Sequence, residues 1–282
     1  MMKVLISGAT GLVGSAVSDF LSKAGHEIYT LVRKKPDNDH QIRWSPTSGV
    51  IDTQALESAQ VDAVIHLAGE SILGLWSTEK KEKIKQSRID GTRLLATAIA
   101  NLDKKPTVLV SASAIGYYGH RDDELLTETS EPGSAIHRQP RNKPFFLFNP
   151  GWGTDFLSDV CQGWEQATEP ARLAGIRTVN VRIGVVLSKE GGALSLMLTP
   201  FKLGVAGPLG NGKQYMSWVS IDDVVGIIHH ALTKETIHGP LNAVAPNPVT
   251  NAEFTKTLST KAFMVPNMGN LANFVPAPSF GL

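Results

Sequence analysis

A chain of 282 residues with 42% hydrophobic and 19% charged residues has the composition of an ordinary soluble globular protein. Its formal net charge of +1 gives no field that would attract nucleic acid or an anionic membrane, and its single cysteine, Cys161, excludes an internal disulfide and a cysteine-based zinc cluster. No apolar run approaches the roughly 18 residues that cross a bilayer, and the run Val4-Leu5-Ile6 leads straight into glycines, unlike a signal peptide. We therefore expect a cytoplasmic protein with a small-molecule substrate and with no nucleic acid or membrane partner.

The first half of the chain alternates short β-branched runs with longer helical patterns. Strands are expected at residues 3–7, 27–32, 63–67, 107–111 and 178–186, and helices at 12–24, 78–101 and 155–174. Strands separated by helices of this length indicate βαβ units and a parallel sheet. The expected fold class is α/β: a Rossmann-type doubly wound parallel sheet over residues 1–190, with a smaller C-terminal substrate region over residues 191–282.

The pattern changes beyond residue 190. Glycine and proline become dense between residues 204 and 212, and short elements are expected at 215–219, 222–232 and 241–244. We interpret this part as a loop-rich region packed on the carboxyl edge of the sheet. Segment 134–153 also stands apart, because it has three prolines, no acidic residue and no clean period, and it indicates a long loop or an insertion.

Three glycines, Gly8, Gly11 and Gly14, stand at a spacing of three between the first strand and the first helix. In dinucleotide-binding folds the first allows a sharp turn, the second lets the backbone approach the pyrophosphate, and the third lets the helix pack against the strand. The N–H groups of the helix N-terminus then face the phosphates. Any tight strand-to-helix turn uses glycine, but the position of this triplet favours a dinucleotide site.

The end of the second strand, Leu31-Val32-Arg33-Lys34-Lys35, has three cations and no carboxylate. NAD-binding domains usually place an acidic residue here, on the ribose hydroxyls. The planar guanidinium of Arg33 instead suits a 2′-phosphate. A solvated basic turn is the alternative, but we predict NADP(H) as the cofactor.

Several further motifs carry a family resemblance. They are Ile65-His66-Leu67-Ala68-Gly69-Glu70, Ser87-Arg88-Ile89-Asp90-Gly91-Thr92, Ser111-Ala112-Ser113-Ala114-Ile115-Gly116-Tyr117-Tyr118-Gly119, Arg182-Ile183-Gly184-Val185-Val186-Leu187, Gly191-Gly192-Ala193 and Gly207-Pro208-Leu209-Gly210. With the glycine triplet they resemble the extended short-chain dehydrogenases/reductases, relatives of the nucleotide-sugar epimerases. Within them the chain is similar to an atypical NAD-dependent epimerase/dehydratase-like subgroup, over residues 3 to about 258.

The resemblance implies a cofactor site that follows the family's plan. From the pyrophosphate through the adenosine phosphate to the nicotinamide end, the implied cofactor-binding residues are Gly8, Thr10, Gly11, Leu12, Val13, Gly14, Val32, Arg33, Leu67, Ala68, Gly69, Arg88 and Val186.

The resemblance also implies a catalytic tyrosine with a lysine four residues later, which lowers the tyrosine pKa. The chain has four tyrosines, and the residues four positions after them are Arg33, Arg121, Asp122 and Val219. The helix expected to carry the pair has Leu157 at the tyrosine position and Cys161 at the lysine position. The usual catalytic dyad is therefore missing.

A polar cluster remains after the strand expected at 107–111. Ser113 occupies roughly the serine position of the family, and Tyr117 and Tyr118 follow it. Tyr117 could donate a proton to a substrate, although buried tyrosines more often only form hydrogen bonds. We take Ser113 and Tyr117 as the candidate catalytic residues.

Other polar residues have structural interpretations. We expect Trp164 in the core, Glu165 as a helix-face or cap partner, and His66 as a partner of local backbone. The pair His229-His230 lacks a third ligand, so no metal site is expected.

The loop 204–218 is a candidate substrate lid. Gln214 and Trp218 are its candidate substrate-binding residues, because an amide beside an aromatic ring suits a polar, flat or sugar-like ligand. The same residues would also fit a glycine-rich surface loop.

Two departures from the family pattern bear on function. The turn Glu131-Pro132-Gly133 is separated from Asp155-Phe156-Leu157 by segment 134–153, and the tail 264–282 does not resemble the C-terminal helices that the family implies. We expect a truncated substrate region and reduced stability. The two hypotheses are an NADP(H)-dependent oxidoreductase or epimerase-like protein acting on a small polar substrate, and an NADP(H)-binding regulatory protein without turnover.

Overall fold

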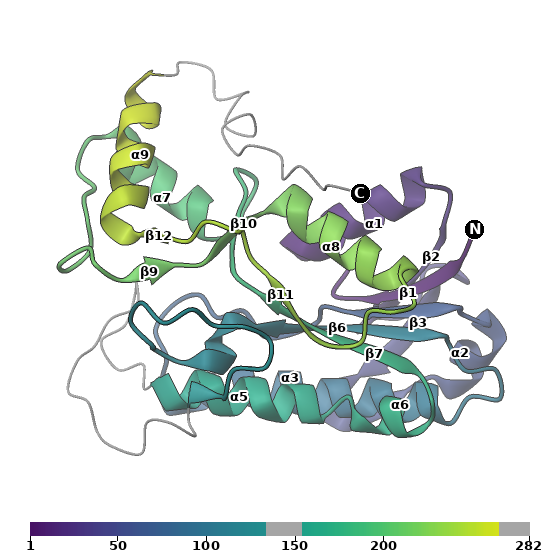
Figure 1. Cartoon of the computed structure of the whole chain (residues 1–282). Coiled ribbons are helices and arrows are strands. Elements are labelled where there is room, and N and C mark those ends of the chain that lie inside the picture. Colours follow the sequence, from purple (N-terminus) through teal and green to yellow (C-terminus); the bar gives the residue numbers. More distant parts are fainter. Residues whose placement is uncertain (134–153, 265–282) are drawn as a thin grey trace.

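The computed structural model describes residues 1–133 and 154–264 and is built around an eight-stranded sheet with the order β11-β7-β6-β5-β1-β2-β3-β4 (Figure 1). These strands are β1 (Lys3–Ser7), β2 (Glu27–Val32), β3 (Gln41–Ser45), β4 (Val50–Ile51), β5 (Ala63–His66), β6 (Val108–Ala114), β7 (Arg177–Ile183) and β11 (Gly239–Ala243). All neighbours pair in parallel except β3 and β4. The predicted doubly wound sheet is confirmed, and its switch point lies between β1 and β5, where such sheets bind ligands.

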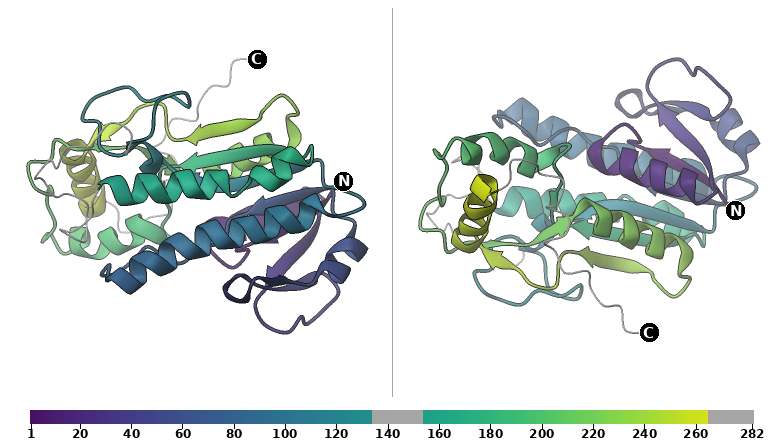
Figure 2. Two further views of the ribbon diagram at one scale, coloured as in Figure 1. Left: turned by 90° about the horizontal axis from the view of Figure 1, so that it is seen from below. Right: turned by 90° about the horizontal axis from the view of Figure 1, so that it is seen from above.

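Helices cover both faces of this sheet (Figure 2). One face carries α1 (Leu12–Lys23) and α8 (Ile221–Thr233); the other carries α3 (Thr78–Ala100), α5 (Thr154–Gln166) and α6 (Glu169–Leu173). The core divides accordingly, with Val4 and Ile6 packed in one apolar cluster and Leu5 and Val64 in the other. Because β1 is buried on both faces, its sequence is continuously apolar and does not alternate.

Side chains cap the helices that lead into and out of the site. Ser77 Oγ accepts the N–H of Lys80 at 3.2 Å at the start of α3, and Ser220 Oγ accepts that of Asp223 at 3.0 Å at the start of α8. Each cap satisfies a backbone donor that the first helical turn leaves free. The helix α1 begins without a side-chain cap, directly after Gly11, so the N–H groups of its first turn are left for another partner.

A smaller cluster of elements lies beyond the carboxyl ends of the strands (Figure 1). Here α7 (Gly192–Lys202) packs on α9 (Asn251–Met264) around a separate apolar cluster with Met197, Phe201 and Leu258 at its centre. Two short strand pairs connect this cluster to the sheet: β8 (Val185–Leu187) with β10 (Trp218–Ser220), and β9 (Tyr215–Met216) with β12 (Val249–Thr250). Two elements from beyond residue 190, α8 and β11, return to the main sheet.

Several elements differ from those expected. The helix expected at 155–174 is two helices, because Pro170, the second residue of α6, has no backbone N–H to continue α5 and fits well in the first turn of a new helix. The strand expected at 178–186 is interrupted at Gly184, where a Cβ would lie 2.4 Å from the carbonyl oxygen of Ser217. The elements β3, β4, α2 (Thr53–Ala59), α7 and α9 were not anticipated. Segment 134–153 lies outside the described residues, and no helix within them is long and apolar enough to cross a membrane.

Arg177, at the start of β7, ties the sheet to the end of α8. Its Nη1 donates to the carbonyl oxygens of Ala231 and Ile237, both at 2.8 Å, and its Nη2 donates to that of Leu232 at 3.0 Å. The carbonyls of Ala231 and Leu232 belong to the last turn of α8, where C=O groups have no partner within the helix.

We expect Arg177→Met to lower the free energy of unfolding by about 2 kcal/mol, because it removes charged hydrogen bonds to three carbonyls. Urea denaturation checks this. Arg172→Met is the matched control, since Arg172 is exposed and pairs only with Glu169, and it should change little. Equal loss in both variants would contradict the assignment.

Candidate functional site

The glycine loop between β1 and α1 is shaped so that only glycine fits. Gly8 has a φ of +72°, and its carbonyl oxygen accepts the N–H of Gly11 at 3.0 Å. A Cβ on Gly14 would lie 2.0 Å from that oxygen, and a Cβ on Gly8 would lie 2.8 Å from the backbone of Leu67 and Ala68. The glycine loop and the loop after β5 are therefore in backbone contact at the switch point.

Ser7 holds the second of these loops. Its Oγ accepts the N–H of Leu67 at 3.1 Å and that of Ala68 at 3.3 Å, and it lies 2.6 Å from Nδ1 of His66. Because the oxygen already accepts two protons, we assign its own proton to Nδ1, which leaves the imidazole proton on Nε2. His66 is fully buried, and its partner is thus the Ser7 hydroxyl and not local backbone as expected.

A basic neighbourhood lies at the carboxyl ends of β2 and β5. Arg33 is exposed directly after β2, and Val32 is half-buried. Nearby, Lys80 Nζ lies 2.5 Å from a carboxylate oxygen of Glu70. The hydrogen bond from Lys80 holds the pKa of Glu70 below its usual value, and the charges of Lys83 and Arg33 act in the same direction. Arg33 therefore lies close enough to Glu70 to influence it.

Arg88 supports the loop after β5 from α3. Its Nη1 donates to the carbonyl oxygens of Glu70 at 3.0 Å and Ile84 at 3.1 Å. A Cβ on Gly69 would lie 3.3 Å from the guanidinium carbon, so any larger residue here would require the guanidinium to shift by a few tenths of an ångström. The guanidinium also lies 5.0 Å from the ring centre of Trp164, which is buried as predicted.

The chain after β8 returns to the glycine loop. Val186 pairs with Val219 of β10, and a Cβ on Gly192 would lie 3.1 Å from Cδ2 of Leu12. Leu12 and Val13 are half-buried, and Thr10 is exposed. The start of α7 thus borders the start of α1, although 180 positions separate Leu12 from Gly192 in the chain.

A polar row crosses the carboxyl edge of the sheet on the α5 side. Ser113, Arg182 and Asn242 are register partners on β6, β7 and β11. Glu165 of α5 binds Arg182 through two hydrogen bonds, Nε to Oε1 at 2.8 Å and Nη2 to Oε2 at 2.9 Å. Ser113 Oγ also donates to Glu165 Oε1, at 2.7 Å. Ser113 is 2% exposed, so its proton is directed into this network.

The two tyrosines of η2 (Ile115–Tyr118) have different surroundings. Tyr118 is buried; its hydroxyl accepts from Arg182 Nη1 at 2.9 Å and donates to Asn242 Oδ1 at 2.6 Å. Tyr117 is half-buried, with the guanidinium carbon of Arg182 3.5 Å from its ring centre, and its carbonyl oxygen accepts from Ser158 Oγ at 2.7 Å. The Tyr118 proton is held in the hydrogen bond to Asn242, so Tyr117 is the better proton donor.

Burial raises the pKa of Tyr117, the charge of Arg182 opposes this, and the charges of Glu165 and Glu131 add to it, so the net shift is upward. The hydroxyl is therefore protonated at neutral pH, so Tyr117 can give a proton but cannot take one, and the raised pKa makes it a weaker acid than an unburied tyrosine.

The positions of the missing dyad are filled by apolar contacts. A Cβ on Gly116 would lie 3.2 Å from Cβ of Leu157 and 3.7 Å from Sγ of Cys161. Burial raises the pKa of the Cys161 thiol to about 12, so this side chain is neutral. Cys161 cannot supply the positive charge of the lysine that the family places there.

The role expected for Glu165 is corrected by this geometry, and Arg182 was not anticipated as a site residue. Glu165 is neither a cap nor a surface side chain, because it neutralises a buried cation. The signal was present in the sequence: an arginine within the apolar strand Arg177–Ile183 needs a buried acidic partner. What the sequence could not show was which acid would supply it.

The candidate substrate residues lie in the smaller cluster of elements. Gln214 is half-buried, and its Nε2 donates to the carbonyl oxygen of Leu209 at 2.9 Å. Trp218 belongs to β10, and its carbonyl oxygen accepts from Ala245 at 2.7 Å. No hydrogen bond or ring contact of the described residues joins either side chain to Ser113 or Tyr117.

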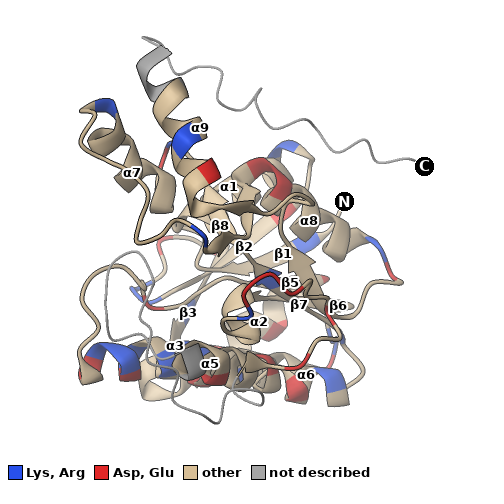
Figure 3. Ribbon diagram, turned by 60° about the vertical axis from the view of Figure 1, so that its left-hand side comes forward, with Lys and Arg blue, Asp and Glu red and all other residues tan. Residues whose placement is uncertain are grey.

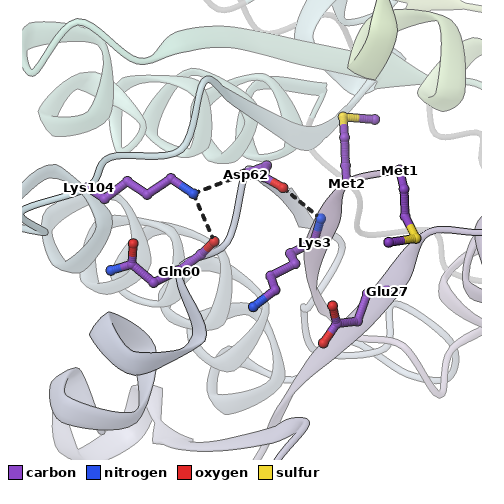
Figure 4. Close-up of a pocket in the computed structure, with 7 residues that line it drawn as sticks. All are labelled: Met1, Met2, Lys3, Glu27, Gln60, Asp62 and Lys104. Atoms are coloured by element: carbon purple, nitrogen blue, oxygen red, sulfur yellow. Dashed lines mark hydrogen bonds and ion pairs between the residues drawn. The ribbon is translucent and has the colours of Figure 1, made fainter.

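Other surface features lie away from this edge. A pocket at the amino end of the sheet is lined by Met1, Met2, Lys3, Glu27, Gln60, Asp62 and Lys104 (Figure 4). There Asp62 accepts from the backbone N–H of Lys3 at 2.9 Å and from Lys104 Nζ at 3.1 Å, so its charge is already paired. Basic and acidic residues are interspersed in the view of Figure 3. Within the described ranges no three His, Cys, Asp or Glu side chains form a metal-binding group.

Comparison with known proteins gives consistent matches. A sequence profile of the NAD dependent epimerase/dehydratase family matches residues 4–142. An epimerase family protein of Mycobacterium tuberculosis (strain CDC 1551 / Oshkosh) is 40% identical over 253 residues, which cover 89% of this chain and 76% of that protein. The human epimerase family protein SDR39U1 is 38% identical over 283 residues, covering 99% and 84%.

Solved structures agree. The crystal structure of human epimerase family protein SDR39U1 (isoform2) with NADPH has a TM-score of 0.75 and 35% identity, covering 93% of this chain and 80% of that one. The nucleoside-diphosphate sugar epimerase from Corynebacterium glutamicum has a TM-score of 0.76 and 40% identity. The match covers 92% of this chain and 50% of the Corynebacterium glutamicum chain, so this chain spans about half of that protein.

The buried His66 generates a testable pH dependence. Burial lowers its pKa to about 4, against 6.5 when the side chain is in solvent, so the folded protein binds this proton less readily than the unfolded chain. The contribution of neutral His66 is complete above pH 6.5 and is lost as the pH falls through 4.

Between pH 7 and pH 4 the wild type should lose about 3 kcal/mol more free energy of unfolding than His66→Asn, which keeps an acceptor for Ser7 but does not titrate. Urea denaturation at a series of pH values measures both. Parallel pH profiles would show that His66 does not remain neutral.

Proposed function

This chain belongs to the NAD dependent epimerase/dehydratase family, and from that membership we propose that it binds NADP(H) and is an oxidoreductase or epimerase-like enzyme for a small polar substrate. The observation that carries the proposal is the backbone contact between the glycine loop and the loop after β5 at the switch point of the sheet. It is supported by the likeness to a human protein whose structure was determined with NADPH.

The residues present fit a dinucleotide. The space that a Cβ at Gly8 or Gly14 would fill is closed by backbone, so the loop keeps its turn and presents the uncapped N-terminus of α1. Thr10, Leu12 and Val13 would border the pyrophosphate, and Leu67 to Gly69 would run beside the dinucleotide. When bound, the nicotinamide supplies a hydride donor or acceptor.

NADP(H) is proposed over NAD(H) because of the end of β2. Arg33 is exposed there and no carboxylate is adjacent in the sequence, so a ribose 2′-phosphate would meet a guanidinium and not a repelling charge. The charge of Arg33 helps to lower the pKa of Glu70, so this cation belongs to the basic neighbourhood at the carboxyl ends of β2 and β5.

Tyr117 is the proposed proton donor. Its hydroxyl is protonated at neutral pH, and its side chain keeps some exposure, whereas the proton of Tyr118 is held by Asn242. Ser113 is proposed to act indirectly, by orienting Glu165, because the Ser113 hydroxyl donates its proton to that carboxylate. Gln214 and Trp218 are proposed to contact the substrate from the smaller cluster of elements.

The second candidate function is a regulatory protein that binds NADP(H) without turnover. Two observations favour it: the positions of the usual dyad hold Leu157 and Cys161, and the Ser113 proton is committed inside the network. The two proposals share the cofactor and differ in whether Tyr117 transfers a proton.

Cofactor preference tests the proposed role of Arg33. Arg33→Ala should weaken NADPH binding by roughly ten- to a hundredfold while leaving NADH binding nearly unchanged, because a charged hydrogen bond to the 2′-phosphate is lost. Fluorescence titration with both nucleotides measures this. Lys23→Ala, an exposed cation at the end of α1, is the control. A retained preference for NADPH in Arg33→Ala would defeat the assignment.

Turnover distinguishes the two candidate functions. With a panel of carbonyl compounds, the wild type should oxidise bound NADPH, and Tyr117→Phe should lower kcat by roughly a hundredfold or more, as the loss of a general acid does. Tyr29→Phe is the matched control, because the Tyr29 hydroxyl donates to Glu27 on the same strand, away from Tyr117. Tight NADPH binding with no turnover on any compound would establish the regulatory alternative instead.

A further inference from the structure

The buried ion pair of Arg182 and Glu165 lies directly against the proposed proton donor. Arg182 is 2% exposed, and a charge buried to this extent is costly unless it is paired and hydrogen-bonded. The plan that the family resemblance implies assigns this pair no role in the reaction.

Arg182 is held in one orientation by its partners. Nε and Nη2 bind Glu165, and Nη1 donates to the Tyr118 hydroxyl and, at 3.1 Å, to the carbonyl oxygen of Glu128. All four contacts use the edge of the planar guanidinium. Its flat face is therefore left to lie against the ring of Tyr117, 3.5 Å from the ring centre.

Glu165 is itself fixed by more than Arg182. Ser113 Oγ donates to it at 2.7 Å from the neighbouring strand, and its helix α5 is bonded to η2 through Ser158. Contacts among β6, β7, α5 and η2 therefore determine where the charge pair lies relative to Tyr117. Such a network can hold the Tyr117 ring, and with it the hydroxyl, in a constant position, as a lysine side chain does in the usual dyad.

We propose that Arg182, oriented by Glu165, takes the place of the missing lysine as the positioning residue for Tyr117. The inference rests on the proposed function, since it assumes that Tyr117 donates the proton. Cys161, at the lysine position on α5, is neutral. The positive charge beside Tyr117 is therefore that of Arg182, which belongs to β7.

This arrangement differs from a lysine in its electrostatic effect. Burial of the ring raises the pKa of Tyr117, the positive charge of Arg182 lowers it, the negative charge of Glu165 raises it, and the net shift is upward. A lysine without a carboxylate beside it would lower the pKa. Burial, and not the charge pair, therefore accounts for the net upward shift of the Tyr117 pKa, and the protonated hydroxyl suits the direction in which a proton leaves it.

The substrate class that suits this direction is a carbonyl compound. The carbonyl carbon receives the hydride, the C=O double bond becomes a single bond, and the oxygen takes the proton of Tyr117 Oη to give an alcohol. NADPH, the reductant in the proposed function, becomes NADP⁺. The tyrosinate is then reprotonated from solvent, which restores the site.

The test is the titration of Tyr117 itself, followed by NMR of protein labelled with ring-¹³C tyrosine. The chain has four tyrosines, so Tyr117→Phe identifies the signal. Glu165→Gln removes the negative charge and should lower the Tyr117 pKa. Glu165→Gln with Arg182→Met removes both charges, and because the effect of Arg182 exceeds that of Glu165, it should raise the Tyr117 pKa above the wild-type value.

A matched control is Glu169→Gln, which neutralises the exposed partner of Arg172 and should leave the Tyr117 titration unchanged. Unchanged Tyr117 titration in both site variants, or shifts in the same direction, would overturn the inference. If the double variant does not fold, Glu165→Gln decides alone, since a Tyr117 pKa that stays constant or rises would also overturn it.

The same data separate this inference from the proposed function. Opposite shifts in a protein that turns over no carbonyl compound would refute the enzyme and leave Arg182 and Glu165 in control of Tyr117. Turnover with an unresponsive Tyr117 would support the enzyme and refute the positioning role.

Discussion

The contact between Gly8 and the backbone of Leu67 and Ala68 is the constraint on which the rest of the site depends. Because a Cβ would lie only 2.8 Å from that backbone, no other residue fits between the two loops. Ser7 Oγ fixes the second loop by accepting the N–H groups of Leu67 and Ala68. Two neighbouring parallel strands thereby present their carboxyl ends as one rigid edge. The start of α7, the Arg88 guanidinium and the basic end of β2 are arranged around that edge.

A second constraint operates at the next pair of strands, where Arg182 is buried with Glu165. Removing two charges from water costs several kcal/mol for each ion, which their attraction offsets only with good geometry and further hydrogen bonds. Here two hydrogen bonds join the pair, and Ser113 and Tyr118 contribute others. Apolar residues could fill the same volume without the desolvation cost, so the pair has a reason other than stability. Its position against Tyr117 supplies one.

The two constraints separate cofactor binding from proton transfer. Binding depends on backbone shape and glycine, and the family membership of the chain agrees with it. Proton transfer depends on a dyad that this chain lacks, since Leu157 and Cys161 pack against Gly116 where the dyad would lie. The hydroxyl proposed as the proton donor lies instead on η2, the short helix after β6, against Arg182 of β7. In this proposal the fold keeps its nucleotide site while the catalytic charge comes from another strand.

The sequence by itself determined the local features: the glycine turn, the β1–α1 unit, the parallel sheet and the absence of the dyad. Each depends on residues close together in the chain, where steric rules and periodicity operate directly. Only the tertiary structure decided which side chains share a buried charge. Strand register brings together Ser113, Arg182 and Asn242, and the packing of α5 on the sheet adds Glu165. For the same reason Glu165 was expected to be a helix-face or cap partner, and His66 a partner of local backbone. Their environments are set by contacts across the sheet, which no spacing within the chain records.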